Sequence, residues 1–222
     1  MTASDLLQLL TARASHVGVE ILPAVADRLV KYYELLERWN RTINLTSLRN
    51  RDAAMDRLLI EPIAASTFLP NRPRLMDIGS GGGSPAIPLA IALKAASLVM
   101  VESHGRKAAF LREAARQLDI PSVLVHDGRL ETLEVQSLGE KLPSLISVRA
   151  VRVDLALLEA LKDFLVVGGK LALFSTETSL PELDAVGLRI DATHYLPSGA
   201  ALLLGSDPRR LPQNVPRGTF KP

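Results

Sequence analysis

The stretch LMDIGSGGGSP, residues 75–85, decides the fold that this sequence predicts. Four glycines within residues 79–83 allow a sharp turn and let a ligand approach the backbone with no Cβ in the way. An apolar run at residues 74–78 precedes them, and Pro85 can begin a helix after them. This order predicts a ligand site at the carboxyl end of a parallel strand.

Downstream of this loop, short apolar runs alternate with helical segments. The runs cover residues 74–78, 98–102, 122–126, 144–148 and 170–174. Runs that are apolar on both faces predict a doubly wound, Rossmann-like and mostly parallel α/β sheet with helices on both faces. Residues 187–195 and 200–205 follow with no helix-length gap between them, which predicts an antiparallel hairpin at the end of the sheet.

Helices are predicted upstream of the sheet. Thr2 and Asp5 form a capping-box sequence, Pro23 begins a second helix, and a third covers about 52–68 with a kink at Pro62. We therefore expect an N-terminal helical extension over 1–70, a domain built on the glycine loop over 71–206, and a basic, proline-rich tail over 207–222.

Composition excludes several kinds of chemistry. The 222 residues include no cysteine, which rules out disulfides, thiolate metal sites and a cysteine nucleophile. The four histidines have no metal-ligand spacing, so we expect no metal. The first ten residues have no basic leader, and the longest apolar stretch, 85–101, is broken by Lys94. We expect no membrane association and a cytoplasmic location.

Positive charge is concentrated in two segments. Residues 38–57 hold five arginines against two aspartates, and residues 207–222 hold four basic residues against one aspartate, a net of +3 each. Such segments are typical of proteins that bind a polyanion, although solvated arginine-rich surfaces are an equal alternative. The candidate RNA-binding residues are Arg41, Arg49, Arg57, Arg209, Arg210, Arg217 and Lys221.

The spacing of the glycines indicates the ligand. Gly79, Gly81 and Gly83 form GxGxG after the acidic Asp77, a pattern typical of S-adenosylmethionine sites. A dinucleotide GxGxxG reading would end on Ser84. Glu102 ends the second predicted strand, where a carboxylate can accept hydrogen bonds from both ribose hydroxyls. Nicotinamide enzymes place an acid there too, so an oxidoreductase stays an alternative.

Five motifs then resemble one family. They are WNRTINLTS at 39–47, GSGGGSPAIPLAI at 79–91, GRLE at 128–131, Arg149-Ala150, and the basic end at 215–218 with Lys221-Pro222. They resemble motifs of ribosomal small-subunit methyltransferase G, also called glucose-inhibited division protein B. The first resembles that family's WNxxxNLTS, the second its GxGxGxPGIPLAI, the third its GRxE and the fourth its SRA. The basic end resembles the family's C-terminal motif. The likeness spans most of the chain, in the family's order.

The resemblance implies a methyltransferase domain over 71–206 that methylates N7 of a guanine in small-subunit (16S) ribosomal RNA, alone or within an assembling subunit. It implies donor contacts at Gly79, Ser84, Leu130, Glu131 and Arg149, with Leu130 and Glu131 beside the adenine. With the residues from the loop, the expected S-adenosylmethionine site comprises Asp77, Gly79, Ser80, Gly81, Gly83, Ser84, Glu102, Leu130, Glu131 and Arg149. Arg149 is the candidate at the reaction centre.

The chain departs from the family pattern in three places. The RHxxDS stretch reads Arg57-Leu58-Leu59-Ile60-Glu61-Pro62, the serine of SRA is Val148, and the usual Lys-Gly is Ser175-Thr176. Two alternatives therefore stay open: a methyltransferase of the same fold with another acceptor, and a non-catalytic, donor-sensing RNA-binding protein.

Guanine N7 methylation suits the available residues. N7 carries a lone pair and no proton, so the reaction requires alignment and exclusion of water and no general base. Methylation at C5 of cytosine requires a cysteine, which is absent. Away from the reaction centre, we expect Trp39 to pack the N-terminal helices on the sheet, and His104 and His126 to have structural roles.

Overall fold

A computed structural model of the chain describes residues 2–46, 50–139, 141–175 and 183–208. Their centre is a seven-stranded sheet with the order β3-β2-β1-β4-β5-β7-β6. The strands are β1 Arg74–Ile78, β2 Ser97–Glu102, β3 Val123–Asp127, β4 Leu145–Arg149, β5 Lys170–Ser175, β6 Arg189–Tyr195 and β7 Ala201–Ser206. Strands β1 to β5 are parallel, and β7 is antiparallel to β5 and β6, which confirms the predicted sheet and its final hairpin.

The strand order changes direction at β1. Ile78, the last residue of β1, lies opposite Val101 of β2 on one side and Val148 of β4 on the other. The chain ends of three parallel strands therefore meet at one edge of the sheet. In an open α/β sheet, this switch point is where ligands bind.

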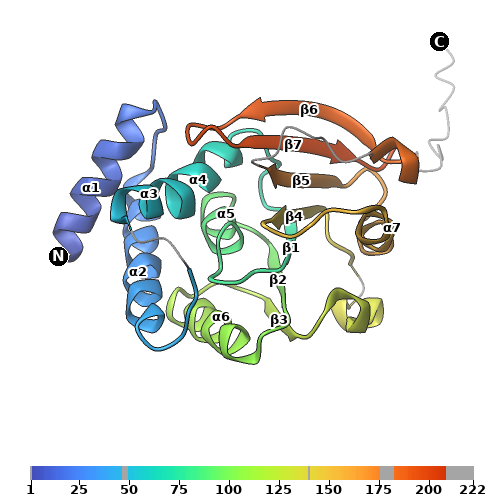
Figure 1. Ribbon diagram of the computed structural model, residues 1–222, viewed down its shortest axis with the longest axis horizontal. Coiled ribbons are helices and arrows are strands. Elements are labelled where there is room, and N and C mark those ends of the chain that lie inside the picture. The colour runs from blue at the N-terminus through green and yellow to red at the C-terminus, as the bar shows by residue number, and fades with distance from the viewer. Residues whose placement is uncertain (1, 47–49, 140, 176–182, 209–222) are drawn as a thin grey trace, which may run out of the picture.

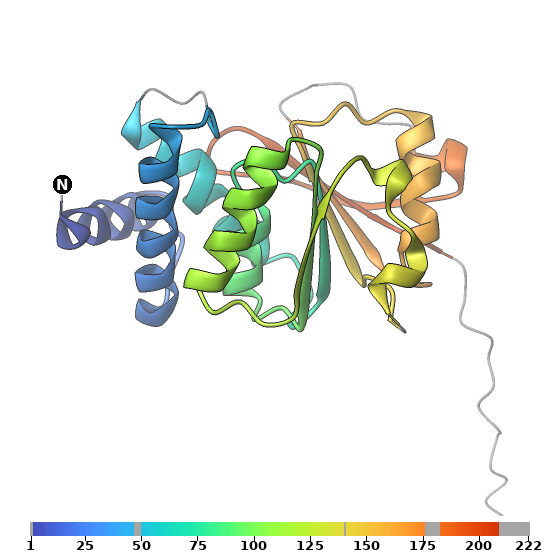
Figure 2. The ribbon, with the colours of Figure 1, turned by 90° about the horizontal axis from the view of Figure 1, so that it is seen from below.

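Helices cover both faces of the sheet, but unequally (Figures 1 and 2). One face carries α5 Ala86–Ala92 and α6 Gly105–Gln117, with α2 Pro23–Asn40 and α1 Ala3–His16 outside them. The other face carries α7 Leu155–Phe164 and the short 3-10 turns η2 Leu130–Thr132, η3 Val135–Leu138 and η4 Leu183–Val186. Within the described ranges, no helix is long and apolar enough to cross a membrane.

The N-terminal helices share one core with the sheet domain. Leu10 and Leu29 belong to the same buried cluster as Ile87 and Phe110. The ring of Trp39 meets that of Phe110 edge to face at 5.6 Å, which confirms the predicted packing role of Trp39. The capping box of α1 is also confirmed, because Thr2 and Asp5 exchange side-chain to backbone hydrogen bonds.

The third helix is present as three consecutive segments: α3 Arg51–Met55, a π-helical turn η1 Asp56–Ile60, and α4 Glu61–Ser66. The irregularity precedes Pro62 and has a local cause. The N–H of Glu61 donates to the carbonyl of Asp56, five residues back, and Pro62 has no N–H to donate. The carbonyls of Arg57 and Leu58 accept hydrogen bonds from side chains of other segments.

Candidate functional site

A cleft of about 500 Å³ lies at the switch point. The loop after β1 and the ends of β2 and β4 form its floor, and the connection after α2 and the π-helical turn form its opposite wall. Its lining residues are Leu36, Asn44, Leu45, Thr46, Arg57, Leu58, Gly79, Ser80, Gly81, Gly82, Ser84, Glu102, Ser103, His104, Lys107, Arg149 and Ala150.

Two glycines of the loop have different tasks. Both have positive φ, +53° at Gly81 and +87° at Gly83, which L side chains rarely adopt. A Cβ on Gly83 would lie 2.7 Å from Cδ1 of Ile87, so this glycine lets the loop pack on α5. A Cβ on Gly81 would meet only the carbonyl oxygen of Gly79, at 3.8 Å. Gly81 is therefore the glycine that borders open space.

Glu102 holds the loop in place from the β2 side. Its side chain is buried and lines the cleft. Oε2 accepts from the Gly81 N–H at 2.7 Å, and Oε1 accepts from the His104 N–H at 2.8 Å and contacts His104 Nδ1 at 3.0 Å. From α2, the Tyr32 hydroxyl donates to the Gly82 carbonyl at 2.6 Å. The loop is thus preorganised from both sides.

Asp77 lies below the loop and is 1% exposed. Oδ1 accepts from the Ser147 hydroxyl at 2.5 Å, whereas Oδ2 has no hydrogen-bond partner among the described residues. Burial raises the pKa of Asp77 to about 6, although the hydrogen bond from Ser147 opposes the shift. A buried carboxylate oxygen without a partner is costly. Asp77 is not among the residues that line the cleft, and it lies directly before the glycine loop that does.

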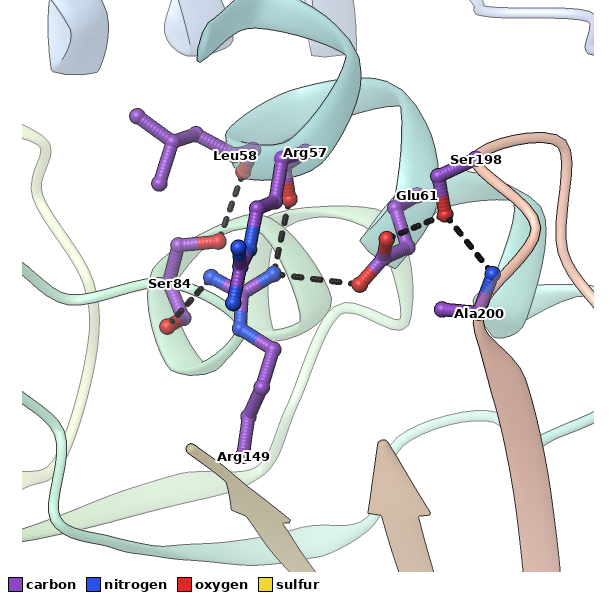
Figure 3. A network of polar contacts seen from close by, with 7 residues as sticks. All are labelled: Arg57, Leu58, Glu61, Ser84, Arg149, Ser198 and Ala200. Atoms are coloured by element: carbon purple, nitrogen blue, oxygen red, sulfur yellow. Dashed lines mark hydrogen bonds and ion pairs between the residues drawn. The ribbon is translucent and has the colours of Figure 1, made fainter. Parts of the chain in front are cut away.

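Arg149 lines the cleft from the end of β4, and its guanidinium reaches the π-helical turn (Figure 3). Its side chain is 8% exposed, and its guanidinium donates to the carbonyls of Arg57 and Ser84, both at 2.7 Å, and to Glu61 Oε1 at 3.3 Å. The Ser84 hydroxyl donates to the Leu58 carbonyl at 2.7 Å. Burial lowers the pKa of Arg149, and Glu61 opposes that shift.

The structure brings most of the predicted donor residues to this cleft. Gly79, Ser80, Gly81, Ser84, Glu102 and Arg149 line it, and Asp77 and Gly83 support it. Leu130 and Glu131 lie in η2, after β3, and are not among the lining residues; Leu130 is buried in the core on the α7 side, and Glu131 is exposed. Their contact with adenine stays a prediction, as does any contact of Arg149 with substrate.

Two of the predicted RNA-binding arginines are described. Arg41 is exposed directly after α2, and Arg57 is exposed and lines the cleft. Arg41 lines a neighbouring cavity of about 470 Å³, which shares Leu36, Thr46 and Leu58 with the cleft. Positive charge therefore lies beside the opening of the site. Arg49, Arg209, Arg210, Arg217 and Lys221 lie outside the described residues.

Several residues at the site were not predicted. Asn40 organises the cleft wall, since its Oδ1 accepts from the N–H groups of Leu45 and Thr46 at 2.8 and 3.0 Å. Asn40 belongs to the WNRTINLTS motif, so the sequence contained a signal for this residue. Glu61 stands at the aspartate of the RHxxDS pattern, which is also a signal, whereas Tyr32 and Lys107 have no local signal. The described residues hold no group of three or more His, Asp or Glu side chains that could bind a metal ion.

Known proteins resemble this chain in sequence. The model of the family described as rRNA small subunit methyltransferase G (GidB) matches residues 26–193. A protein of that name from Neisseria meningitidis serogroup C is 33% identical over 124 residues, which are 56% of this chain and 60% of the relative. Another, from Xylella fastidiosa strain M23, is 39% identical over 157 residues, 69% of this chain and 68% of the relative. The match thus spans less than two thirds of the Neisseria relative.

Solved structures support the fold alone. A SAM dependent methyltransferase from Aquifex aeolicus superposes with a TM-score of 0.53 at 14% identity, over 68% of this chain and 92% of that one. Identity at this level indicates a shared architecture and carries no information about the substrate.

Proposed function

We propose that this chain, which belongs to the rRNA small subunit methyltransferase G family, transfers a methyl group from S-adenosylmethionine to N7 of a guanine in small-subunit ribosomal RNA. One observation carries the proposal. At the switch point of the sheet, a glycine loop held by Glu102 borders a cleft, and below it Asp77 has a buried carboxylate oxygen without a described partner.

The cleft is large enough for a small molecule, and its chemistry suits the ribose of the donor. A volume of about 500 Å³ lies within the range of small-molecule sites, roughly 300–1,000 Å³. Glu102 is placed to accept hydrogen bonds from the ribose hydroxyls, in exchange for its contact with the exposed His104 side chain. Asp77 Oδ2 can accept from the donor's amino group. We place the adenine towards Leu130 and Glu131, beyond the lining residues.

The bound donor supplies an electrophilic methyl group on a sulfonium, and the chain supplies position. N7 of guanine has no proton to lose, so no side chain has to act as a base. The loop and Glu102 fix the donor, and the wall at Leu58 and Arg149 limits where the acceptor can lie. Arg57 and Arg41 are exposed beside the opening and are suited to contact phosphates of the RNA.

One observation favours a second candidate, a methyltransferase of the same fold with another acceptor. Leu58 lines the cleft where the family pattern has histidine, so the acceptor wall is apolar at this position. Activity on a small molecule and none on RNA would select this candidate.

We propose a cytoplasmic location, because ribosomes are assembled in the cytoplasm. We also propose small-subunit RNA or an assembling subunit as the partner.

Two measurements test the proposal. Isothermal titration of the full chain with S-adenosylmethionine is expected to show one site per chain. Small-subunit RNA from a strain that lacks this methyltransferase is then incubated with the chain and methyl-labelled donor. Nucleoside mass spectrometry is expected to find label in 7-methylguanosine. Donor binding with label in another nucleoside would change the acceptor, and the absence of donor binding would refute the proposal.

A further inference from the structure

The side of the cleft formed by Arg149 depends on an irregular turn of backbone. In a regular helix the carbonyls of Arg57 and Leu58 would accept from the N–H groups of residues 61 and 62. Here Glu61 donates to Asp56 instead, and Pro62 has no N–H. Both carbonyls therefore accept from side chains outside the helix, Arg57 from Arg149 and Leu58 from Ser84.

These two hydrogen bonds connect the π-helical turn to the end of the glycine loop. Ser84 is held twice, because its hydroxyl donates to Leu58 and its carbonyl accepts from Arg149 (Figure 3). Ser84 directly follows Gly83 and lines the cleft. A shift of the Arg149 guanidinium would therefore release one of the two contacts that fix the end of the loop.

Glu61 is the acidic partner of that guanidinium. It is 3% exposed, and each of its carboxylate oxygens has a partner: Oε1 accepts from Arg149 at 3.3 Å and Oε2 from the Ser198 hydroxyl at 2.5 Å. A buried carboxylate is costly unless it is paired and hydrogen-bonded, so this geometry is closely constrained. Ser198 lies between β6 and β7, which ties the end of the sheet to the cleft.

We propose that Glu61 is a positioning residue for the methyl donor. It holds Arg149 across the carbonyls of Arg57 and Ser84, and through them it fixes the end of the glycine loop in the conformation that binds the donor. The inference rests on the proposed function, since the ligand is S-adenosylmethionine.

The chain contains a matched control for this network. Asp191 on β6 accepts from Arg189, Lys170 and the hydroxyl of Ser206, as Glu61 accepts from Arg149 and the hydroxyl of Ser198. None of these four control residues lines the cleft. Substitutions at Asp191 and Ser206 therefore remove an ion pair linked to a serine away from the donor, in a network whose basic partners are more exposed than Arg149.

The experiment measures the Kd of S-adenosylmethionine by isothermal titration on the full chain, at a temperature where circular dichroism shows each variant folded. We expect Glu61→Gln to raise the Kd about tenfold and Asp191→Asn to leave it within about twofold. Glu61→Asp, which keeps the charge, is expected to recover part of the affinity. Equal Kd values for Glu61→Gln, Asp191→Asn and the wild type would overturn the inference and make the role of Glu61 purely structural.

If Glu61→Gln does not fold, a second pair of variants with smaller changes tests the inference. Ser198→Ala removes the hydroxyl that holds Oε2 and leaves the ion pair intact, and Ser206→Ala is its control. We expect about a threefold rise in Kd for Ser198→Ala alone, and an unchanged Kd would overturn the inference. Failure of the wild type itself to bind the donor would instead refute the proposed function.

Discussion

The two sides of the cleft are built in different ways. On the β2 side, Glu102 and Gly81 are 21 residues apart and belong to one strand–loop–helix–strand unit. On the β4 side, Arg149 reaches Arg57 across 92 residues, and Glu61 reaches Ser198 across 137. The first side is a local unit of the fold, whereas the second exists only when the N-terminal helices have packed on the sheet. The β4 side therefore depends more on tertiary packing.

The largest loss of stability is expected from a substitution on the β4 side. Arg149→Ala leaves the carboxylate of Glu61 buried without its cation, which costs about 3–5 kcal/mol of unfolding free energy. Urea denaturation followed by circular dichroism measures this loss. Arg112→Ala, which removes an exposed pair with Asp127, is the control and is expected to cost less than about 1 kcal/mol. Equal losses would contradict the assignment of Arg149 to a buried network.

The second prediction concerns how the stability of the folded chain changes with pH through Asp77. The folded-state pKa of Asp77, about 6, lies above its ordinary value, so the folded chain binds the proton more tightly than the unfolded chain. The resulting stabilisation is present below about pH 4 and is lost as the pH rises to about 6. Asp77→Asn removes this titration, so its unfolding free energy is expected to fall less than that of the wild type as the pH rises from 4.5 to above 6, and donor binding is expected to weaken. Urea titrations between pH 4.5 and 8 check the first effect.

The Kd of the donor is also expected to depend on pH. If the ionised Asp77 carboxylate accepts from the donor's ammonium group, the Kd of S-adenosylmethionine is constant between about pH 6 and pH 7.5 and rises below pH 6. Isothermal titration of the wild type and of Asp77→Asn across this range separates the two roles of the residue. A Kd for the wild type that does not change through pH 6 would place the amino group elsewhere.

The third effect is expected on the β2 side. Glu102→Ala removes the acceptor of the Gly81 N–H and the proposed partner of the ribose, so the Kd for the donor should rise roughly a hundredfold. Glu113→Ala, on the exposed face of α6, is the control and should leave the Kd unchanged. A change smaller than about threefold at Glu102 would show that the β2 side does not hold the sugar.

The smallest effect is expected where the two sides meet. Tyr32→Phe removes the hydroxyl that donates to the Gly82 carbonyl, which costs about 1 kcal/mol of unfolding free energy. Its side chain is otherwise preserved in the core. Because the loop loses one anchor, the donor Kd should rise by less than about fivefold. A larger rise than that for Glu102→Ala would contradict the role of Glu102 as the main anchor of the loop.

The sequence predicted the elements and residues of the β2 side, because its signals are local, whereas their contact with the donor stays a prediction. Strand periodicity, the glycine spacing and the position of Glu102 are readable within residues 74–102, and the sheet order follows the usual rules for such units. The capping box of α1, the start of α2 and the packing of Trp39 were also readable, since each depends on near neighbours.

The β4 side was not readable in the same way. Arg149 was selected by its motif, but its contacts with Glu61 and Ser84 require three segments that are distant in sequence. Pro62 predicted a kink, whereas the structure has a π-helical turn before it, because the freed carbonyls find side-chain partners in the folded state. Such partners follow from tertiary packing and have no period in the sequence.

The decisive measurement is a crystal structure of the full chain with S-adenosylmethionine. We expect the donor in the cleft, with its ribose hydroxyls on Glu102, its amino group at Asp77 Oδ2 and its sulfonium facing the wall that contains Arg149 and Leu58. A donor bound elsewhere, or a ribose that does not contact Glu102, would contradict it.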